Sequence, residues 1–173
     1  YISDGTSGEV TVAHGGSIAS SDGRVTLTFP PHTVSEDVDI RFAPIKPDVT
    51  GGMRDIGQSY QLQVVPAGTS GPSVDTVAGA YTVVTHYAED DVGPIDESTL
   101  ALYHWDGSQW VKEPSSTVNP AANTVTATPN HFSQWAVLGR ARTGQPGLSF
   151  RYVETFGETQ EAYFPRTDHL NGP

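Results

Sequence analysis

The chain has 173 residues with 18 Gly, 13 Pro, one Met and no Cys, a composition that favours short strands and frequent turns over helices. The absence of Cys excludes disulfides, thiol catalysis and zinc sites built on Cys. With 20 acidic against 9 basic side chains the net charge is −11 at pH 7, which repels nucleic-acid phosphates and excludes nucleic acid as an expected partner.

Five segments in the first half of the chain alternate apolar and polar residues, and turn residues close each of them. Alternation of this kind is typical of strands with one buried face. Several short strands at nearly regular spacing indicate a β-sandwich. The five segments span residues 8–16, 23–31, 38–45, 60–68 and 81–88.

The second half of the chain continues the same pattern. Residues 98–114 contain Asp106-Gly107 between two apolar and aromatic runs, which is a strong local signal for a β-hairpin. Residues 123–139, "NTVTATPNHFSQWAVLG", predict two more strands that are broken at Pro129. We therefore predict an all-β fold, an antiparallel β-sandwich.

The character of the sequence changes after Gly139. Residues 140–149, "RARTGQPGLS", are polar, contain Gly and Pro and show no periodicity, so they are predicted to be a linker. The sandwich domain is accordingly assigned to residues 1–139 and a short C-terminal extension to residues 150–173. We expect the chain to be a piece of a longer protein.

A family resemblance lies in "GGSIASSDGRVTLTFPPHTVSEDVDIRF", residues 15–42. A Gly-Gly start followed by a strand and a Pro-Pro turn resembles the opening of the ZU-type β-sandwich of ankyrins, netrin receptors and zonula occludens proteins. The resemblance extends over about residues 15–139. The end of the extension, "HLNGP", is similar to the lead-in to an NHL-type β-propeller blade. The resemblances imply a secreted or surface-attached prokaryotic multidomain protein.

The tripeptide His131-Phe132-Ser133 stands where self-cleaving ZU-type relatives carry "HFS" or "SFS". In those relatives, found in death-domain adaptors and inflammasome sensors, the chain is cut before the serine. The resemblance implies that this protein cleaves its own Phe132–Ser133 bond, that no cofactor or metal is needed, and that no external substrate is involved. The cleaved fragments are expected to stay associated, each being the other's partner.

The chemistry of such a cut follows from the residues themselves. The Ser133 hydroxyl is able to attack the carbonyl of Phe132 through a five-membered ring, which converts the amide into an ester that water hydrolyses. A planar amide resists this attack, so we expect strain at the bond and a base beside the hydroxyl. Side chains alternate along a strand, which would place His131 on the face of Ser133 and Phe132 on the other.

The hairpin supplies a second candidate base. If Trp105 faces Trp110, His104 pairs with Val111, and Glu113 lies diagonally from His104 on the same face. The self-cleaving relatives carry a His and then a Glu upstream of the serine at similar spacing. The resemblance therefore implies that His104 is the base and that Glu113 holds it. Either His131, or His104 held by Glu113, is thus predicted to be the base.

The alternative is a non-catalytic spacer or adhesion module that presents the following propeller. Its acidic loop offers oxygen ligands for calcium but lacks the spacing of an EF-hand. An aromatic group on the hairpin offers a platform for glycan or peptide. The remaining histidines are predicted to be surface residues. The acidic loop contains Glu89, Asp90, Asp91, Asp96 and Glu97, the aromatic group is Tyr103, Trp105 and Trp110, and these histidines are His14, His32, His86 and His169.

No stretch of the sequence is apolar over the length needed to cross a bilayer, so membrane insertion is not expected. The first ten residues, "YISDGTSGEV", lack the basic start and apolar run of a signal peptide. The expectation of an extracellular or cell-surface location therefore rests on the family resemblances alone.

Overall fold

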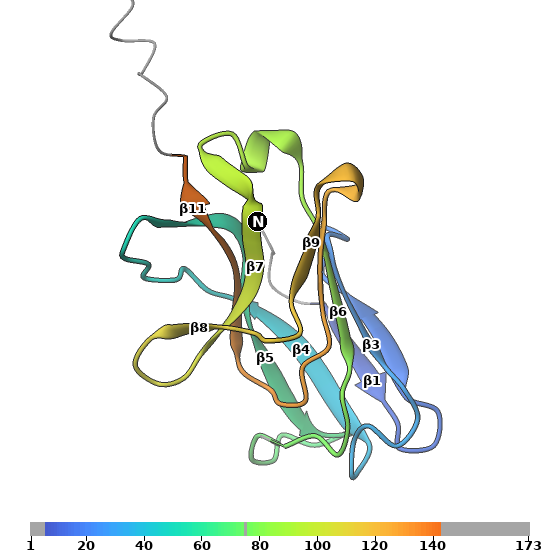
Figure 1. Cartoon of the computed structure of the whole chain (residues 1–173). Helices are drawn as coiled ribbons and strands as arrows, with labels where there is room; N and C mark the ends of the chain where they lie inside the picture. Colours follow the sequence, from blue (N-terminus) through green and yellow to red (C-terminus); the bar gives the residue numbers. More distant parts are fainter. Residues whose placement is uncertain (1–5, 75, 143–173) are drawn as a thin grey trace, which may run out of the picture. The chain divides into compact units, whose positions relative to one another are not determined.

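The computed structural model describes residues 6–74 and 76–142, and these form two antiparallel sheets (Figure 1). The six-stranded sheet contains, in spatial order, β1 (Ser7–Val10), β4 (Val38–Pro44), β5 (Met53–Pro66), β11 (Gln134–Ala141), β7 (Ile95–Trp105) and β8 (Trp110–Lys112). The five-stranded sheet contains β2 (Gly16–Ala19), β3 (Val25–Phe29), β6 (Thr82–His86), β10 (Thr124–Ala127) and β9 (Thr117–Asn119). Two 3-10 turns, η1 (Glu89–Asp91) and η2 (Pro120–Ala122), lie in the connections.

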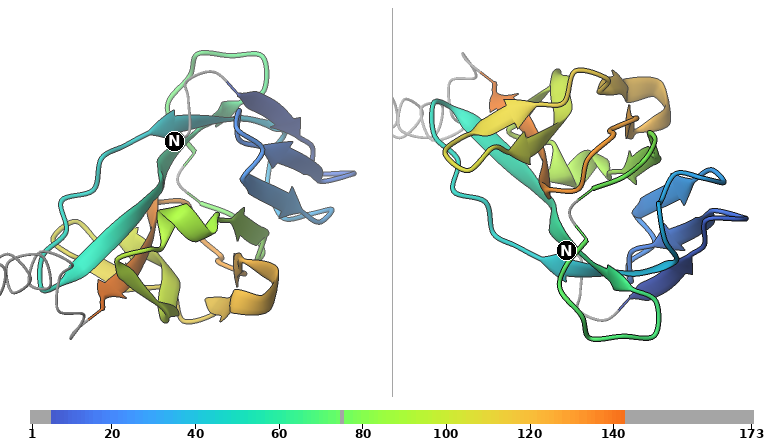
Figure 2. Two further views of the ribbon diagram at one scale, coloured as in Figure 1. Left: turned by 90° about the horizontal axis from the view of Figure 1, so that it is seen from above. Right: turned by 90° about the horizontal axis from the view of Figure 1, so that it is seen from below.

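The sheets pack face to face on one hydrophobic core, as the two views in Figure 2 show. Strand alternation creates this core, because every second residue points between the layers. In β3, Val25, Leu27 and Phe29 are buried, and in β4 the buried residues include Ile40 and Phe42. The predicted all-β fold and antiparallel β-sandwich are confirmed.

Strand β11 occupies the interior of the six-stranded sheet, where it pairs with β5 on one side and β7 on the other. Its Trp135 lies opposite Tyr60 of β5 and opposite His104 of β7. Trp135, Val137 and Leu138 are at most 1% exposed, as expected for the last strand. A strand buried on both faces and paired on both edges is among the most firmly held parts of a sandwich.

The predicted hairpin is confirmed in its register. Trp105 pairs with Trp110 and His104 with Val111, and the two indole rings meet edge to face with centroids 5.6 Å apart. The Asp106 carboxylate accepts hydrogen bonds from the backbone N–H groups of Ser108 and Gln109, both at 2.8 Å. Gly107 adopts a φ of 102°, which a residue with a Cβ rarely reaches, so the Asp-Gly pair fixes this turn.

Several boundaries differ from the prediction. The expected strand 8–16 is divided by a tight turn closed by hydrogen bonds between Thr11 and Gly15, and its two ends belong to different sheets. Strand β5 begins at Met53 instead of residue 60, because its first half pairs with β11. Strand β9 pairs only with β10 in its sheet and was not predicted, because its three residues are too few to show a pattern.

The sandwich ends with β11 at Ala141, and the chain divides there into two units, 1–141 and 142–173. Most of the predicted linker 140–149 and the whole extension 150–173 lie outside the described residues. Among residues 6–74 and 76–142, no helix has the length and apolar character that crossing a membrane requires.

Candidate active site

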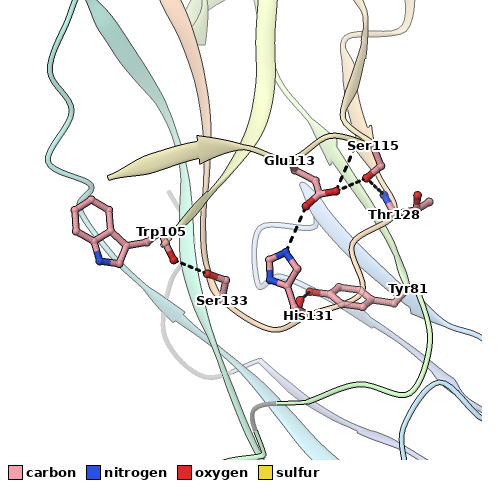
Figure 3. Close-up of polar contacts among 7 residues, drawn as sticks. All are labelled: Tyr81, Trp105, Glu113, Ser115, Thr128, His131 and Ser133. Carbon is pink, nitrogen blue, oxygen red and sulfur yellow. Dashed lines mark hydrogen bonds and ion pairs between the residues drawn. The ribbon is translucent and has the colours of Figure 1, made fainter. Parts of the chain in front are cut away.

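The segment before β11 is held in place by neighbouring elements on both sides. The backbone N–H of Thr128 donates to the Ser115 hydroxyl at 2.9 Å, and the N–H of Tyr81 donates to the Pro129 carbonyl at 3.0 Å. The Tyr81 hydroxyl donates to the His131 carbonyl at 3.0 Å (Figure 3). Burial raises the pKa of Tyr81 well above its usual value, so this phenol remains a protonated donor.

Phe132 packs against the core, but regular alternation does not place it there, because the core residues Trp135 and Val137 of β11 have the opposite parity. Its ring centroid lies 5.7 Å from that of Tyr81 and 6.3 Å from that of Phe29. Regular strand structure begins only at Gln134, so the tripeptide immediately precedes β11, and His131 forms an isolated bridge with Thr76. The packed ring and the anchored His131 carbonyl together fix the peptide bond that follows Phe132.

His104, Glu113 and His131 come together beside this bond, and we name them the His-Glu-His cluster. One ligand atom of each residue lies within 4.8 Å of the others. The His131 Nε2 atom is 3.5 Å from Glu113 Oε2, and the two histidine rings meet edge to face at 4.8 Å between centroids. β7, the segment after β8 and the segment before β11 each contribute one member.

The carboxylate of Glu113 is the buried member of the cluster, with a side chain only 8% exposed. Its Oε1 atom accepts hydrogen bonds from the hydroxyl of Ser115 at 2.7 Å and from the backbone N–H of Ser115 at 3.2 Å. Oε2 faces His131 (Figure 3). The prediction paired Glu113 with His104; the 3.5 Å contact of its carboxylate is with His131 Nε2, although all three groups are close.

The environment of His104 favours its neutral form. Burial lowers the pKa of His104 and the nearby His131 lowers it further, while Glu113 and Asp106 act in the opposite direction. Its Nδ1 atom is buried and has no hydrogen-bond partner. Trp135 packs against both histidines, at 5.9 Å from the His104 ring and 5.0 Å from the His131 ring. A neutral imidazole with an available lone pair is suited to accept a proton.

The Ser133 hydroxyl donates its hydrogen bond to the backbone carbonyl of Trp105 at 3.2 Å. Figure 3 shows Ser133 directed toward Trp105, whereas His131 is directed toward Glu113. Within the described residues no hydrogen bond joins this hydroxyl to His104 or His131. Neither Phe132 nor Ser133 has a positive φ, so the backbone gives no left-handed strain at the bond. For its proton to pass to a histidine, the hydroxyl would have to rotate away from the Trp105 carbonyl.

The acidic loop uses several of its carboxylates locally. Asp91 forms a 2.6 Å ion pair with Arg24 and also accepts from the Ala88 N–H at 2.8 Å. Glu97 accepts from the Tyr87 hydroxyl at 2.7 Å. Across residues 6–74 and 76–142, the one group of three potential metal-ligating side chains is the His-Glu-His cluster, not the acidic loop.

The aromatic group borders a groove of about 300 Å³ that also includes residues of the β4–β5 connection. The indole N–H of Trp110 donates to the Asp48 carbonyl at 3.1 Å, which ties the hairpin to that connection. The other histidines that the structure describes, His14, His32 and His86, are exposed as predicted; His169 lies outside the described residues.

Three residues that support the site were not predicted. Ser115 orients Glu113, Tyr81 anchors the His131 carbonyl, and Trp135 packs against both imidazoles. Ser115 has a local signal, because it lies two residues after Glu113 in a turn. Tyr81 is distant in sequence and carries no such signal.

No protein-family model matches the chain, and no curated protein gives a significant match.

Proposed function

We propose that this β-sandwich cleaves its own Phe132–Ser133 peptide bond. The observation that carries the proposal is the His-Glu-His cluster, which gathers a buried carboxylate and two imidazoles within 4.8 Å of one another beside the bond. Ionisable groups gathered in this way are common where protons are transferred. The resemblance of residues 15–139 to ZU-type sandwiches, and of "HFS" to their cleavage site, supports the same conclusion.

The first step is an N-to-O acyl shift. The Ser133 hydroxyl oxygen bonds to the carbonyl carbon of Phe132 while a histidine takes the hydroxyl proton. The C–N bond then breaks, and the Ser133 nitrogen receives a proton and becomes a free amine. The product of this step is an ester between the Phe132 carbonyl and the Ser133 oxygen.

Water completes the reaction by hydrolysing the ester. A carboxylate forms at Phe132, the Ser133 hydroxyl is restored, and one water is consumed for each bond that is cut. Because the substrate is the chain itself, each molecule reacts once, and the acyl shift and hydrolysis use no cofactor. Glu113 stabilises the protonated form of the histidine that it faces.

The proposal is tested by denaturing the purified 173-residue chain and measuring the intact masses of its components. Two species are expected, one ending at Phe132 and one beginning at Ser133. Ser133→Ala removes the nucleophile and should leave a single chain, whereas Ser133→Cys should still be cut, through a thioester. A wild-type chain that stays whole through long incubation at neutral pH overturns the proposal.

Hydroxylamine distinguishes self-cleavage from cutting by a contaminating protease. It attacks esters much faster than amides, so it should accelerate cleavage of a slow variant and leave a hydroxamate on Phe132. Ser133→Ala should not respond. Cleavage that is insensitive to hydroxylamine and to the Ser133 substitution points to an outside protease.

The location of β11 predicts the state of the products. Cutting before Ser133 leaves the pairing of β11 with β5 and β7, and the burial of Trp135, unaffected. The two fragments should therefore elute together in native size-exclusion chromatography and separate only in denaturant. Release of residues 133–173 under native conditions would contradict this expectation.

A specific observation favours the second candidate, a non-catalytic spacer module. The Ser133 hydroxyl is bound to the Trp105 carbonyl and to neither histidine, an arrangement that also suits an unreactive serine. The same mass measurement separates the candidates. In the spacer, wild type and Ser133→Ala are equally intact.

A further inference from the structure

The His-Glu-His cluster also has the composition of a metal site, and we propose that it binds a divalent transition-metal ion, with zinc as the best match. Imidazole nitrogen and carboxylate oxygen are both zinc donors, and two histidines with one glutamate are a donor set that catalytic zinc sites use. The members come from three separate segments, and one ligand atom of each lies within 4.8 Å of the others.

The distances suit zinc after small side-chain movements. With zinc–ligand bonds of roughly 2.0 to 2.1 Å, two ligands of a tetrahedral ion lie about 3.3 Å apart. The separation of His131 Nε2 from Glu113 Oε2 is 3.5 Å, close to this value. His104 has to approach the other two from within 4.8 Å, which requires a change in the orientation of its side chain.

The electrostatics of the cluster favour a cation. The Glu113 carboxylate is buried, and a buried negative charge needs a compensating partner. Its Oε1 atom is held by Ser115, which leaves Oε2 directed toward the histidines. A ligand carboxylate fixed by a hydrogen bond to a neighbouring residue is typical of metal sites.

Two further observations indicate a site that an ion is able to enter and occupy. The Nδ1 atom of His104 is buried without a hydrogen-bond partner, and coordination or a ring rotation would satisfy an imidazole nitrogen that the protein leaves unpaired. The His131 side chain is 37% exposed, so the cluster is open to solvent on that side. Three protein ligands would leave the fourth position for water.

The binding test uses the full-length Ser133→Ala chain, which has no hydroxyl nucleophile and so remains whole. Zinc chloride is titrated into the metal-free chain by calorimetry, and cobalt chloride is used to record the visible spectrum. One zinc per chain is expected, together with the intense visible bands of tetrahedral cobalt. Glu113→Gln and His131→Ala should each weaken zinc binding by about ten-fold or more, while the exposed His86→Ala should not.

Other outcomes of the titration overturn the proposal. Absence of saturable zinc binding does so, as does binding that Glu113→Gln and His131→Ala leave unchanged. Near-ultraviolet circular dichroism of each variant establishes that it is folded. If Glu113→Gln is not folded, His131→Ala alone decides the result, because the His131 side chain is partly exposed, whereas that of Glu113 is buried.

A consequence for cleavage rests on the proposed function. A bound zinc ion occupies the imidazole lone pairs that would accept the Ser133 proton, so zinc should inhibit cleavage. Wild-type chain is isolated in the unfolded state. It is then refolded in the presence of zinc or of EDTA, and the cleaved fraction is measured over time. Faster or equal cleavage with zinc contradicts the inhibition. If Ser133→Ala binds zinc but the wild type is not cleaved in EDTA, the self-cleavage proposal is wrong and the metal site stands. If the wild type is cleaved but Ser133→Ala does not bind zinc, the metal site is wrong and self-cleavage stands.

Discussion

The acidic loop and the His-Glu-His cluster differ in the number of their carboxylates and in how those carboxylates are surrounded. The loop holds five carboxylates, yet Asp91 is neutralised by Arg24 and Glu97 accepts from the Tyr87 hydroxyl. The cluster has one carboxylate, which is buried and faces an imidazole. Exposed charges are well solvated and seldom do chemistry, whereas a buried charge has few partners and interacts strongly with each of them.

The largest expected effect separates the two regions by their role in cleavage. His104→Ala should slow cleavage by about 100-fold or more, the usual contribution of a general base, whereas Asp90→Asn in the acidic loop should have no effect. Rates are measured on freshly refolded chains by the fraction cut. If His104→Ala cleaves normally and His131→Ala is inactive, the base is His131. Equal rates in wild type and both histidine variants would remove the cluster from the mechanism.

A smaller effect is expected for the carboxylate of the cluster. Glu113→Gln retains an oxygen that accepts from Ser115 but loses the charge that stabilises a protonated histidine, so cleavage should slow by about ten-fold. Glu97→Gln is the control, because Glu97 is partly buried and, like Glu113, accepts a hydrogen bond from a side-chain hydroxyl. An equal loss of rate in both variants would indicate a general effect of charge and not a role for Glu113.

The pH dependence of stability tests the environment of His104 in the cluster. The folded state lowers the pKa of His104 below 6.5, so at a pH between the two values the unfolded chain binds more protons. This contribution is fully present above pH 6.5 and is lost as the pH falls toward the folded-state pKa. With EDTA present, wild type should lose more thermal stability than His104→Gln between pH 7.5 and 5.5. Equal losses would show that His104 titrates normally.

The smallest effect is expected from calcium. Because carboxylates of the acidic loop already have partners such as Arg24 and Tyr87, calcium should leave the melting temperature unchanged relative to EDTA. Magnesium serves as the control for ionic strength. A saturable stabilisation by calcium that Asp90→Asn and Asp96→Asn remove would reverse the comparison and support the adhesion module.

The parts of the site that follow local rules were predictable from sequence. Asp106-Gly107 determines the hairpin, the hairpin determines that Trp105 faces Trp110, and this register places His104 and Glu113 on one face. These features depend on residues close in sequence, where turn chemistry and side-chain period are decisive.

The remaining features depend on contacts between distant segments. The pairing of Ser133 with the Trp105 carbonyl joins residues 28 positions apart, and the Tyr81 bond to His131 spans 50 positions. No local sequence pattern predicts either contact. The early start of β5 has the same origin, because Met53 is paired by Arg140 near the end of the sandwich. The intrinsic strand propensity of a segment is outweighed where pairing with a distant strand supplies its backbone hydrogen bonds.

The interior location of β11 has a mechanical consequence if the bond before Ser133 opens. Among the described residues beyond the cut, the attachment to the sandwich then consists of the hydrogen bonds and buried side chains of this strand, between β5 and β7. Pulling along that strand loads all of these bonds at once in shear, whereas pulling across it breaks them one after another. The joint would resist tension in one direction and yield in the other, and a yielded strand would leave two unpaired sheet edges behind.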